Sequence, residues 1–364
     1  MDLAEYEAAG LYDPAAAQAE ARAELIAYLV EIGCTLDEMV EANRRGRLFA
    51  LAGDRVIIPG RDQFSLADIS TTTGTALAEI RMIWRALGYV DAPDDLPVAS
   101  LEEVEAVRVC AEMSQLLGMA GVLGVCRTVA SSLTRVADAT SAAVRTQVPQ
   151  LALDVTGSEA VTARTFAGVA TFVPRMARAL DTLFRHHLEV ARMNWERSDS
   201  GDLVDSGAVR VGVGFADLSG FTGLTEGLTM AELSQLLTGF ETVAEEVVRG
   251  RDGRVVKYIG DAVMYVTHDA PAAVHVAQGL LDAARDRGMQ ARAGVAVGAV
   301  LALQGDYFGP VVNLAARLVA LADAGEILVT DDVVQRIGGS VRVDQLGPRS
   351  IRGFSQEIEI ARVR

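Results

Sequence analysis

Two aspartates in the second half of the chain stand where a divalent metal ion could bind. Asp217 follows the β-like segment 209–215 and precedes a Ser-Gly turn, and Asp261 lies in the Gly-Asp turn of a predicted hairpin over residues 254–266. Mg²⁺ and Mn²⁺ prefer oxygen ligands, commonly a few carboxylates together with the phosphates of a substrate. The backbone amides of residues 219–222 could hold such phosphates. The alternative to metal binding is that Asp217 only caps the end of a strand and that Asp261 is an ordinary turn residue.

A second set of residues carries positive charge or an amide. Lys257 is the only lysine among 33 basic residues, and the rest are arginines. This favours the interpretation that the position requires an ammonium group and that a guanidinium would not fit. Asn313 and Arg317 are four residues apart on a predicted helix over 311–321, so they share one face. An amide and a cation on the same helix face could bind a ribose and a phosphate of one ligand. The alternative is an exposed polar face of an amphipathic helix.

The sequence of the second half predicts the strands and helices that would position these residues. Strands are expected at residues 209–215, 254–266 (as a hairpin), 292–303 and 326–330, and helices at 230–248, 270–285 and 311–321. The order β-α-β-β-α-β, followed by a further helix and trailing strands, is typical of a ferredoxin-like domain, an antiparallel sheet with helices on one face. The fold class is therefore α+β, with an all-α domain in front.

The first half is predicted to be helical because its apolar residues recur at three- and four-residue spacing. Residues 64–88 have the outline of a helix-turn-helix, which indicates either DNA binding or two packed helices. A last helix is expected at 174–197, and a small polar stretch then marks a boundary. We expect a regulatory domain over 1–197, a linker over 198–208 and a catalytic domain over 209–364.

Composition excludes several classes of protein. Half of the residues are hydrophobic and 23% are charged, so the chain is expected to fold around a core. The longest apolar run, 116–126, is shorter than the about 20 residues of a membrane span, and no signal peptide precedes it. Three unpaired cysteines indicate a reducing, cytoplasmic location. The net charge of −16 argues against a partner that is a nucleic acid.

Taken together, the motifs resemble those of the class III nucleotidyl cyclases over residues 209–363. The resemblance implies that Asp217 and Asp261 bind two divalent metal ions, Mg²⁺ or Mn²⁺. It implies that Lys257 and Asp306 recognise adenine, the lysine donating to a ring acceptor and the aspartate accepting from the exocyclic amine. Guanylyl cyclases of this family carry Glu and Cys at these two positions, so the substrate is expected to be ATP.

The resemblance implies further roles. Asn313 and Arg317 orient the ribose and stabilise charge in the transition state, and Arg352 is a looser match to the family's residue at the triphosphate. Leu218, Phe221 and Thr222 are expected to contact the substrate. The chain would then be an adenylate cyclase, a phosphorus–oxygen lyase in which the 3′-hydroxyl of ATP attacks its own α-phosphorus and expels pyrophosphate. In this family each site is shared between two copies, so a homodimer is expected.

The first half is expected to regulate the second. Soluble actinobacterial cyclases with a helical N-terminal domain are similar in layout, and some respond to pH. His186 and His187 lie on the last predicted helix, so they are candidate sensors for relief of autoinhibition by acid; two histidines without a switching role are the alternative. The apolar stretch 116–126 is expected to be an interior helix, with a pocket for a lipid or another small molecule as the other interpretation.

Two other functions are possible for these motifs. A diguanylate-type cyclase carries its signature on a similar hairpin, but residues 258–262 lack a Gly-Gly-Asp-Glu-Phe run and the Asn313/Arg317 pair fits only the first family. The alternative of another class is a non-catalytic transcription regulator that senses a nucleotide and binds DNA through residues 64–88. The acidic first half and the complete set of site residues count against it.

Overall fold

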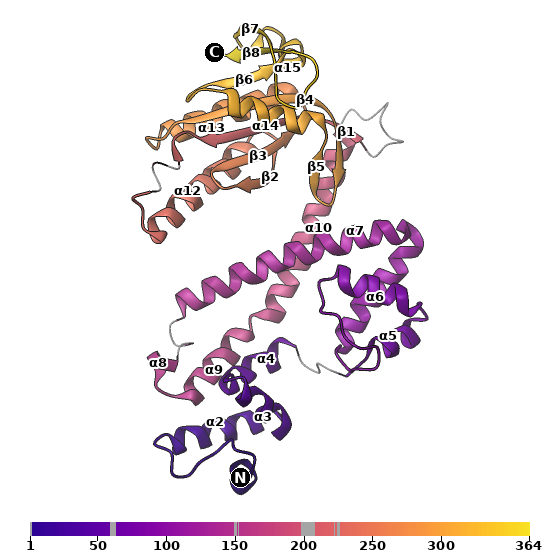
Figure 1. Cartoon of the computed structure of the whole chain (residues 1–364), viewed down its shortest axis with the longest axis vertical. Helices are drawn as coiled ribbons and strands as arrows, with labels where there is room; N and C mark the ends of the chain where they lie inside the picture. The colour runs from indigo at the N-terminus through magenta and orange to yellow at the C-terminus, as the bar shows by residue number, and fades with distance from the viewer. Residues whose placement is uncertain are drawn as a thin grey trace. The chain divides into compact units, whose positions relative to one another are not determined.

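The computed structural model describes residues 2–58, 63–148, 151, 153–197, 208–221, 223 and 226–364. Contacts within the chain define two compact units, residues 1–187 and 188–364, whose elements are labelled in Figure 1. Most of the linker expected at 198–208 lies outside the described residues. Each unit is described by itself.

The first unit is helical, as predicted, and helix α10 runs on from it into the second. Its helices are α1 (Ala4–Ala8), α2 (Ala19–Glu31), α3 (Leu36–Arg44), α4 (Leu51–Ile57), α5 (Leu66–Thr73), α6 (Leu77–Ala86), α7 (Leu101–Gln147), α8 (Leu153–Thr156), α9 (Glu159–Ala170) and α10 (Val173–Arg197). Three of these helices begin with a capping box. In each, the Ser or Thr side chain accepts a hydrogen bond from the backbone amide three residues on, and the acidic side chain at that position accepts one from the backbone amide of the Ser or Thr. The pairs are Thr35–Glu38, Ser65–Asp68 and Ser100–Glu103.

The segment with a helix-turn-helix outline forms α5 and α6, joined at Gly74, which ends α5 with a φ of 68°. Ile80, Ile83 and Trp84 of α6 are buried in a cluster shared with α5 and α7. The two arginines of α6 form ion pairs with acids of the following loop, Arg81 with Asp94 at 2.5 Å and Arg85 with Asp91 at 2.7 Å. The second helix is therefore packed, and both of its cations are paired.

Helix α7 is broken at Gly118, whose φ of 71° and ψ of 155° are not helical. Val122 and Cys126 behind the break are buried, whereas Leu116 before it is 85% exposed. By length and composition α7 is nevertheless the one helix among the described residues that could cross a membrane. The absence of a membrane span therefore remains a prediction.

The second unit holds the mixed α/β domain that the sequence predicts. After the end of α10 come β1 (Ala208–Leu218), α12 (Met230–Arg249), β2 (Arg254–Ile259), β3 (Ala262–Thr267), α13 (Ala270–Arg285), β4 (Ala291–Leu303), β5 (Asp306–Phe308), α14 (Pro310–Leu321), β6 (Ile327–Thr330), α15 (Asp331–Ile337), β7 (Val343–Arg349) and β8 (Ile358–Val363). The strand order is β2-β3-β1-β4-β6-β8-β7, with β5 paired to β4. The first four strands are antiparallel neighbours in the ferredoxin-like order.

Helices cover both faces of this sheet, which corrects the expectation of one covered face. Helices α12, α13 and α15 pack on a core that includes Ala216, Val263 and Val295. Alternate residues of the same strands, among them Phe215 and Met264, point to the other face and pack against α14. The βαββαβ core alone has its helices on one side, and α14 follows that core in the chain (Figure 1).

Two glycines of β4 let α14 approach closely. A Cβ at Gly294 would come within 2.5 Å of the Ala315 carbonyl oxygen, and one at Gly298 would come within 2.6 Å of Val311. Ala315 and Leu318 of α14 are fully buried, so the helix presents Asn313 and Arg317 outward. Small residues in β4 thus fix where α14 holds its polar face.

Candidate active site

The two predicted metal-binding aspartates lie side by side at one end of the sheet. Asp217 pairs with Ala262 across the β1–β3 ladder, directly after Asp261 in the β2–β3 turn. The Leu218 amide donates to the Asp261 carbonyl oxygen at 3.4 Å. Burial raises the pKa of the Asp261 carboxyl, and the nearby Asp217 carboxylate raises it further. We call Asp217 and Asp261 the carboxylate pair.

An arginine that the sequence analysis did not single out is paired with one of these two aspartates. Arg292 lies opposite Asp217 across the β1–β4 ladder. Its Nε and Nη2 atoms donate to Oδ2 of Asp217 at 3.1 and 2.8 Å, and its Nη1 donates to the Ala322 carbonyl at 3.4 Å. The signal that could have found it is a lone cation at the start of an otherwise apolar strand, but its partner depends on the register.

The donor chemistry of the carboxylate pair fits a hard divalent cation. Two adjacent carboxylates repel each other, which adds to the effect of burial in raising the pKa of Asp261, and a cation between them would relieve that repulsion. Over the described ranges, no group of three or more His, Cys, Asp or Glu side chains could hold a metal. An ion at the pair would therefore need further oxygen ligands, such as backbone carbonyls, a substrate or water.

Lys257 and Asp306 contact each other, although they are far apart in sequence. The Nζ atom of Lys257 donates to Oδ2 of Asp306 at 2.5 Å, and Oδ1 of Asp306 accepts from the Tyr307 amide at 2.8 Å. The side chains are 40% and 27% exposed, so both remain open to a ligand. Lys257 lies on β2, and Asp306 begins the short strand β5, which the sequence analysis did not predict.

Asn313 and Arg317 lie on one face of α14, as their spacing predicts, and both are exposed. Helix α14 is anchored through Ala315 and Leu318. Within the part of the chain that the structure describes, neither polar side chain has a hydrogen bond or ion pair to another residue. One copy of the chain thus presents this amide and this cation without a ligand of its own.

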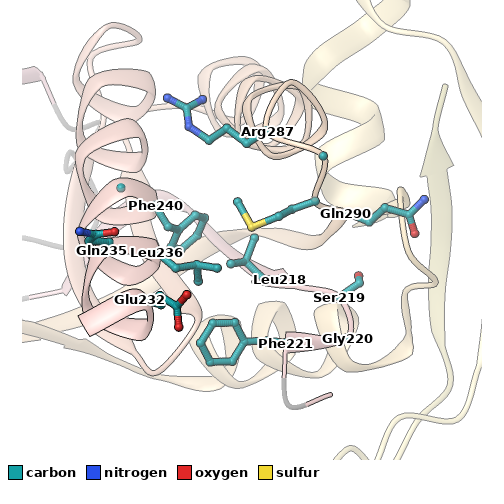
Figure 2. A pocket seen from close by; sticks show the side chains of 13 residues that line it. Leu218, Ser219, Gly220, Phe221, Glu232, Gln235, Leu236, Phe240, Arg287 and Gln290 are labelled. Carbon is teal, nitrogen blue, oxygen red and sulfur yellow. The ribbon is translucent and has the colours of Figure 1, made fainter. Parts of the chain in front are cut away.

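The loop after β1 borders a cavity of about 840 Å³. Figure 2 shows Leu218, Leu236 and Phe240 facing one another inside it, with Ser219 and Gln290 toward one side and Glu232 and Gln235 on α12. The carboxylate pair, Lys257 and Arg317 do not line it. The cavity therefore adjoins the carboxylate pair through the β1 loop, but it does not hold the other site residues.

Only some of the groups in this loop that were predicted to contact the substrate are free to do so. The Ser219 amide donates to the Gln290 carbonyl at 2.7 Å, so it is not free to bind a phosphate, as residues 219–222 were expected to do. The side chain of Leu218 is 3% exposed and belongs to the core. Phe221 is half-buried against the same core and lines the cavity. Thr222 lies outside the described residues.

The remaining predicted residues lie elsewhere. Arg352 is exposed in the turn between β7 and β8, next to Ile351, which packs against Leu318 of α14. That packing brings the Arg352 turn close to the helix that carries Arg317. His186 and His187 are exposed on α10 with ring centroids 5.3 Å apart.

The site residues share one face of the sheet. Asp217 alternates with Phe215, whose side chain belongs to the α14 face, and Arg292 is opposite Asp217. Lys257 pairs with Met264, which is on that face too. Lys257 bonds to Asp306 on β5, whereas Asp261 lies in the turn after β2 and Asp217 bonds to Arg292. One copy therefore assembles two separate half-sites, the carboxylate pair with Arg292 and the Lys257–Asp306 pair.

Comparisons with known proteins find a family for each part of the chain. The model of the adenylate and guanylate cyclase catalytic domain matches residues 205–361, and that of the adenylate cyclase regulatory domain matches residues 4–191. An uncharacterized protein of Mycobacterium tuberculosis is 40% identical over 361 residues, 98% of this chain and 93% of that protein.

Other similar proteins carry functional names. An adenylate cyclase of Streptomyces coelicolor is 31% identical over 288 residues, 77% of this chain and 73% of that protein. A pH-sensitive adenylate cyclase of Mycobacterium tuberculosis is 30% identical over 360 residues, 94% and 88% of the two chains. The crystal structure of the adenylyl cyclase CyaB from P. aeruginosa is 27% identical, with a TM-score of 0.40 over 43% of this chain and 94% of that one.

Proposed function

The chain belongs to the adenylate and guanylate cyclase family, with an adenylate cyclase regulatory domain ahead of the catalytic one, and we propose that it converts ATP into 3′,5′-cyclic AMP and pyrophosphate. The observation that carries the choice of ATP is the contact of Lys257 with Asp306 at 2.5 Å. An ammonium donor beside a carboxylate acceptor complements a ring nitrogen beside an exocyclic amine, which is the edge that adenine presents.

The chemistry needs no nucleophile from the protein. The 3′-hydroxyl of ATP attacks its own α-phosphorus in line, the bond to the β-phosphate oxygen breaks, and pyrophosphate leaves. Two divalent ions, Mg²⁺ or Mn²⁺, held by Asp217 and Asp261, would lower the pKa of that hydroxyl and neutralise the leaving phosphates. Asn313 orients the ribose, and Arg317 stabilises the charge on the phosphoryl oxygens.

Arg292 and Arg352 are the cations we assign to the triphosphate. A guanidinium matches phosphate oxygens bidentately, and Arg292 lies beside the carboxylate pair, where it now donates to Asp217 at 2.8 Å. Phosphates bound there would offer it further acceptors. Arg352 is exposed in its turn and is free to approach from another direction.

We infer that each site is shared by two copies of the chain. The polar face of α14 points outward, and Arg317 has no intramolecular partner over the described ranges. Lys257 and Asp306 are paired with each other, and Asp217 is paired with Arg292, so the two half-sites are separate in one copy. In a homodimer with two-fold symmetry, one copy can supply the metal-binding residues of a site while its partner supplies the base-reading and transition-state residues. The symmetry gives two equivalent sites per dimer.

The test of substrate class uses purified protein with Mn²⁺ and either ATP or GTP, followed by identification of the cyclic product. We expect cyclic AMP from ATP and little product from GTP. Exchanging both base-reading residues, Lys257→Glu with Asp306→Cys, removes two charge-assisted contacts and lowers kcat/KM for ATP by about 100-fold or more. Equal use of ATP and GTP by the unaltered protein would contradict the assignment.

We further propose that residues 1–197 form a regulatory domain that inhibits the catalytic domain, residues 209–364, through the linker 198–208. Support comes from the regulatory-domain match and from a relative named pH-sensitive. His186 and His187 are exposed on α10, the helix that leads into the linker. Histidine gains its charge near neutral pH, so acid is the expected activating signal.

Activity between pH 5.5 and 8 tests this regulation. Relative to a truncated chain that starts at Val209, the full chain should gain about fivefold or more in activity as pH falls. The His186→Gln, His187→Gln double variant should lose that gain. Identical pH profiles for the full and truncated chains would contradict the proposal.

The alternative of a DNA-binding regulator has less support. Arg81 and Arg85, the cations of α6, are already paired with Asp94 and Asp91, so the helix offers little charge to phosphates. A DNA-shift assay beside the ATP assay separates the two classes.

A further inference from the structure

Two of the three cysteines meet inside the first unit. Cys110 and Cys126 lie on the two arms of α7, each eight residues from the break at Gly118. The Sγ atom of Cys126 is 3.5 Å from that of Cys110. The non-helical backbone of Gly118 (φ 71°, ψ 155°) turns one arm back beside the other, and Figure 1 shows α7 bending. The sequence analysis described both residues only as unpaired cysteines.

The packing around the thiols holds them together while leaving one of them within reach. Cys126 is 2% exposed and lies in a small cluster with Ala86 and Val122, and Cys110 packs at its edge, partly exposed. Burial, followed by the contact with Cys126, raises the pKa of Cys110 to about 12. At neutral pH Cys110 is therefore a thiol, which slows its reaction with an oxidant, but it is the more exposed of the two cysteines and would meet an oxidant first.

We propose that Cys110 and Cys126 are a redox modification site, at which a hydroperoxide closes a disulfide between the two arms of α7. Hydrogen peroxide first oxidises the Cys110 thiol to a sulfenic acid and is itself reduced to water. The Cys126 thiol then attacks the Cys110 sulfur, a second water leaves, and an S–S bond remains. The sum is two thiols and one peroxide giving one disulfide and two waters, and a dithiol reductant reverses it.

The short distance makes this site specific. The sulfurs need to move about 1.5 Å closer to reach the length of a disulfide bond, and no helix has to unwind because the break already exists. Cys34 serves as an internal control, since it is buried in a different cluster and burial raises the pKa of its thiol to about 11. It has a similar environment but no neighbouring cysteine among the described residues.

The test treats the full chain with hydrogen peroxide, alkylates the remaining thiols, and maps the peptides by mass spectrometry. We expect loss of two hydrogen atoms from the intact mass, a peptide link between Cys110 and Cys126, an alkylated Cys34, and full recovery of three free thiols after reduction. The link closes a loop, so the first unit should melt about 5 °C higher when oxidised.

Matched variants complete the experiment. Cys34→Ser should form the link as the unaltered chain does, whereas Cys110→Ser and Cys126→Ser should not. Added oxygen at Cys110 without a link to Cys126, or a link that joins Cys34 instead, would overturn the proposal. Because the mapping is done on the unaltered chain, poor folding of a variant does not affect the result.

Discussion

The Arg317→Ala variant is expected to form cyclic AMP about 10³- to 10⁵-fold more slowly than the unaltered protein, with a much smaller change in KM. Charge accumulates on the phosphoryl oxygens only as the α-phosphorus is attacked, so a guanidinium that meets it there acts on kcat. Arg317 suits this role because it is exposed on an anchored helix and has no partner to give up over the described ranges.

Steady-state kinetics with ATP and Mn²⁺ measures this effect. Arg336→Ala provides the control, since Arg336 is also an exposed arginine near the end of a helix, α15. A higher KM with kcat unchanged would mean that Arg317 binds ATP without stabilising the transition state, and would remove it from the mechanism.

Asp217→Asn is expected to lower turnover at least about 10³-fold, because one carboxylate ligand of the divalent ions is lost while the side chain keeps its shape. The amide still accepts a hydrogen bond from Arg292, which donates to this position at 2.8 Å. The fold should therefore survive.

Thermal unfolding with and without Mn²⁺ gives an independent measure. Mn²⁺ should raise the melting temperature of the unaltered protein and of Asp286→Asn, an exposed aspartate at the end of α13, but not of Asp217→Asn. An undiminished Mn²⁺ shift in Asp217→Asn would show that the ions bind elsewhere.

The sequence could predict most of the elements because each pattern is local. Helix α13 was expected at 270–285 and is found at Ala270–Arg285, and the hairpin turns at Gly260 and Asp261 as its Gly-Asp pair predicts. The ferredoxin-like order is also confirmed. Strand β5 was missed because it has three residues, too few for any periodicity.

The parts of the site that depend on pairing could not be predicted. Arg292 meets Asp217 only because the β1–β4 register places them opposite each other, and a sequence does not state its register. The side on which α14 packs depends on Gly294 and Gly298, whose missing side chains leave room for the helix. The hydrogen bond from the Ser219 amide to the Gln290 carbonyl oxygen also joins residues far apart in the sequence, so local patterns do not predict it.

The central claim is that one site is built from two copies, and mixing two inactive variants tests it most directly. Asp217→Asn lacks a metal ligand and Arg317→Ala lacks the transition-state cation, so each alone should be inactive. When both are co-expressed, random pairing gives mixed dimers that hold one intact site, and activity should return to about a quarter of that of the unaltered protein. Activity no higher than that of the separate variants would contradict the shared site.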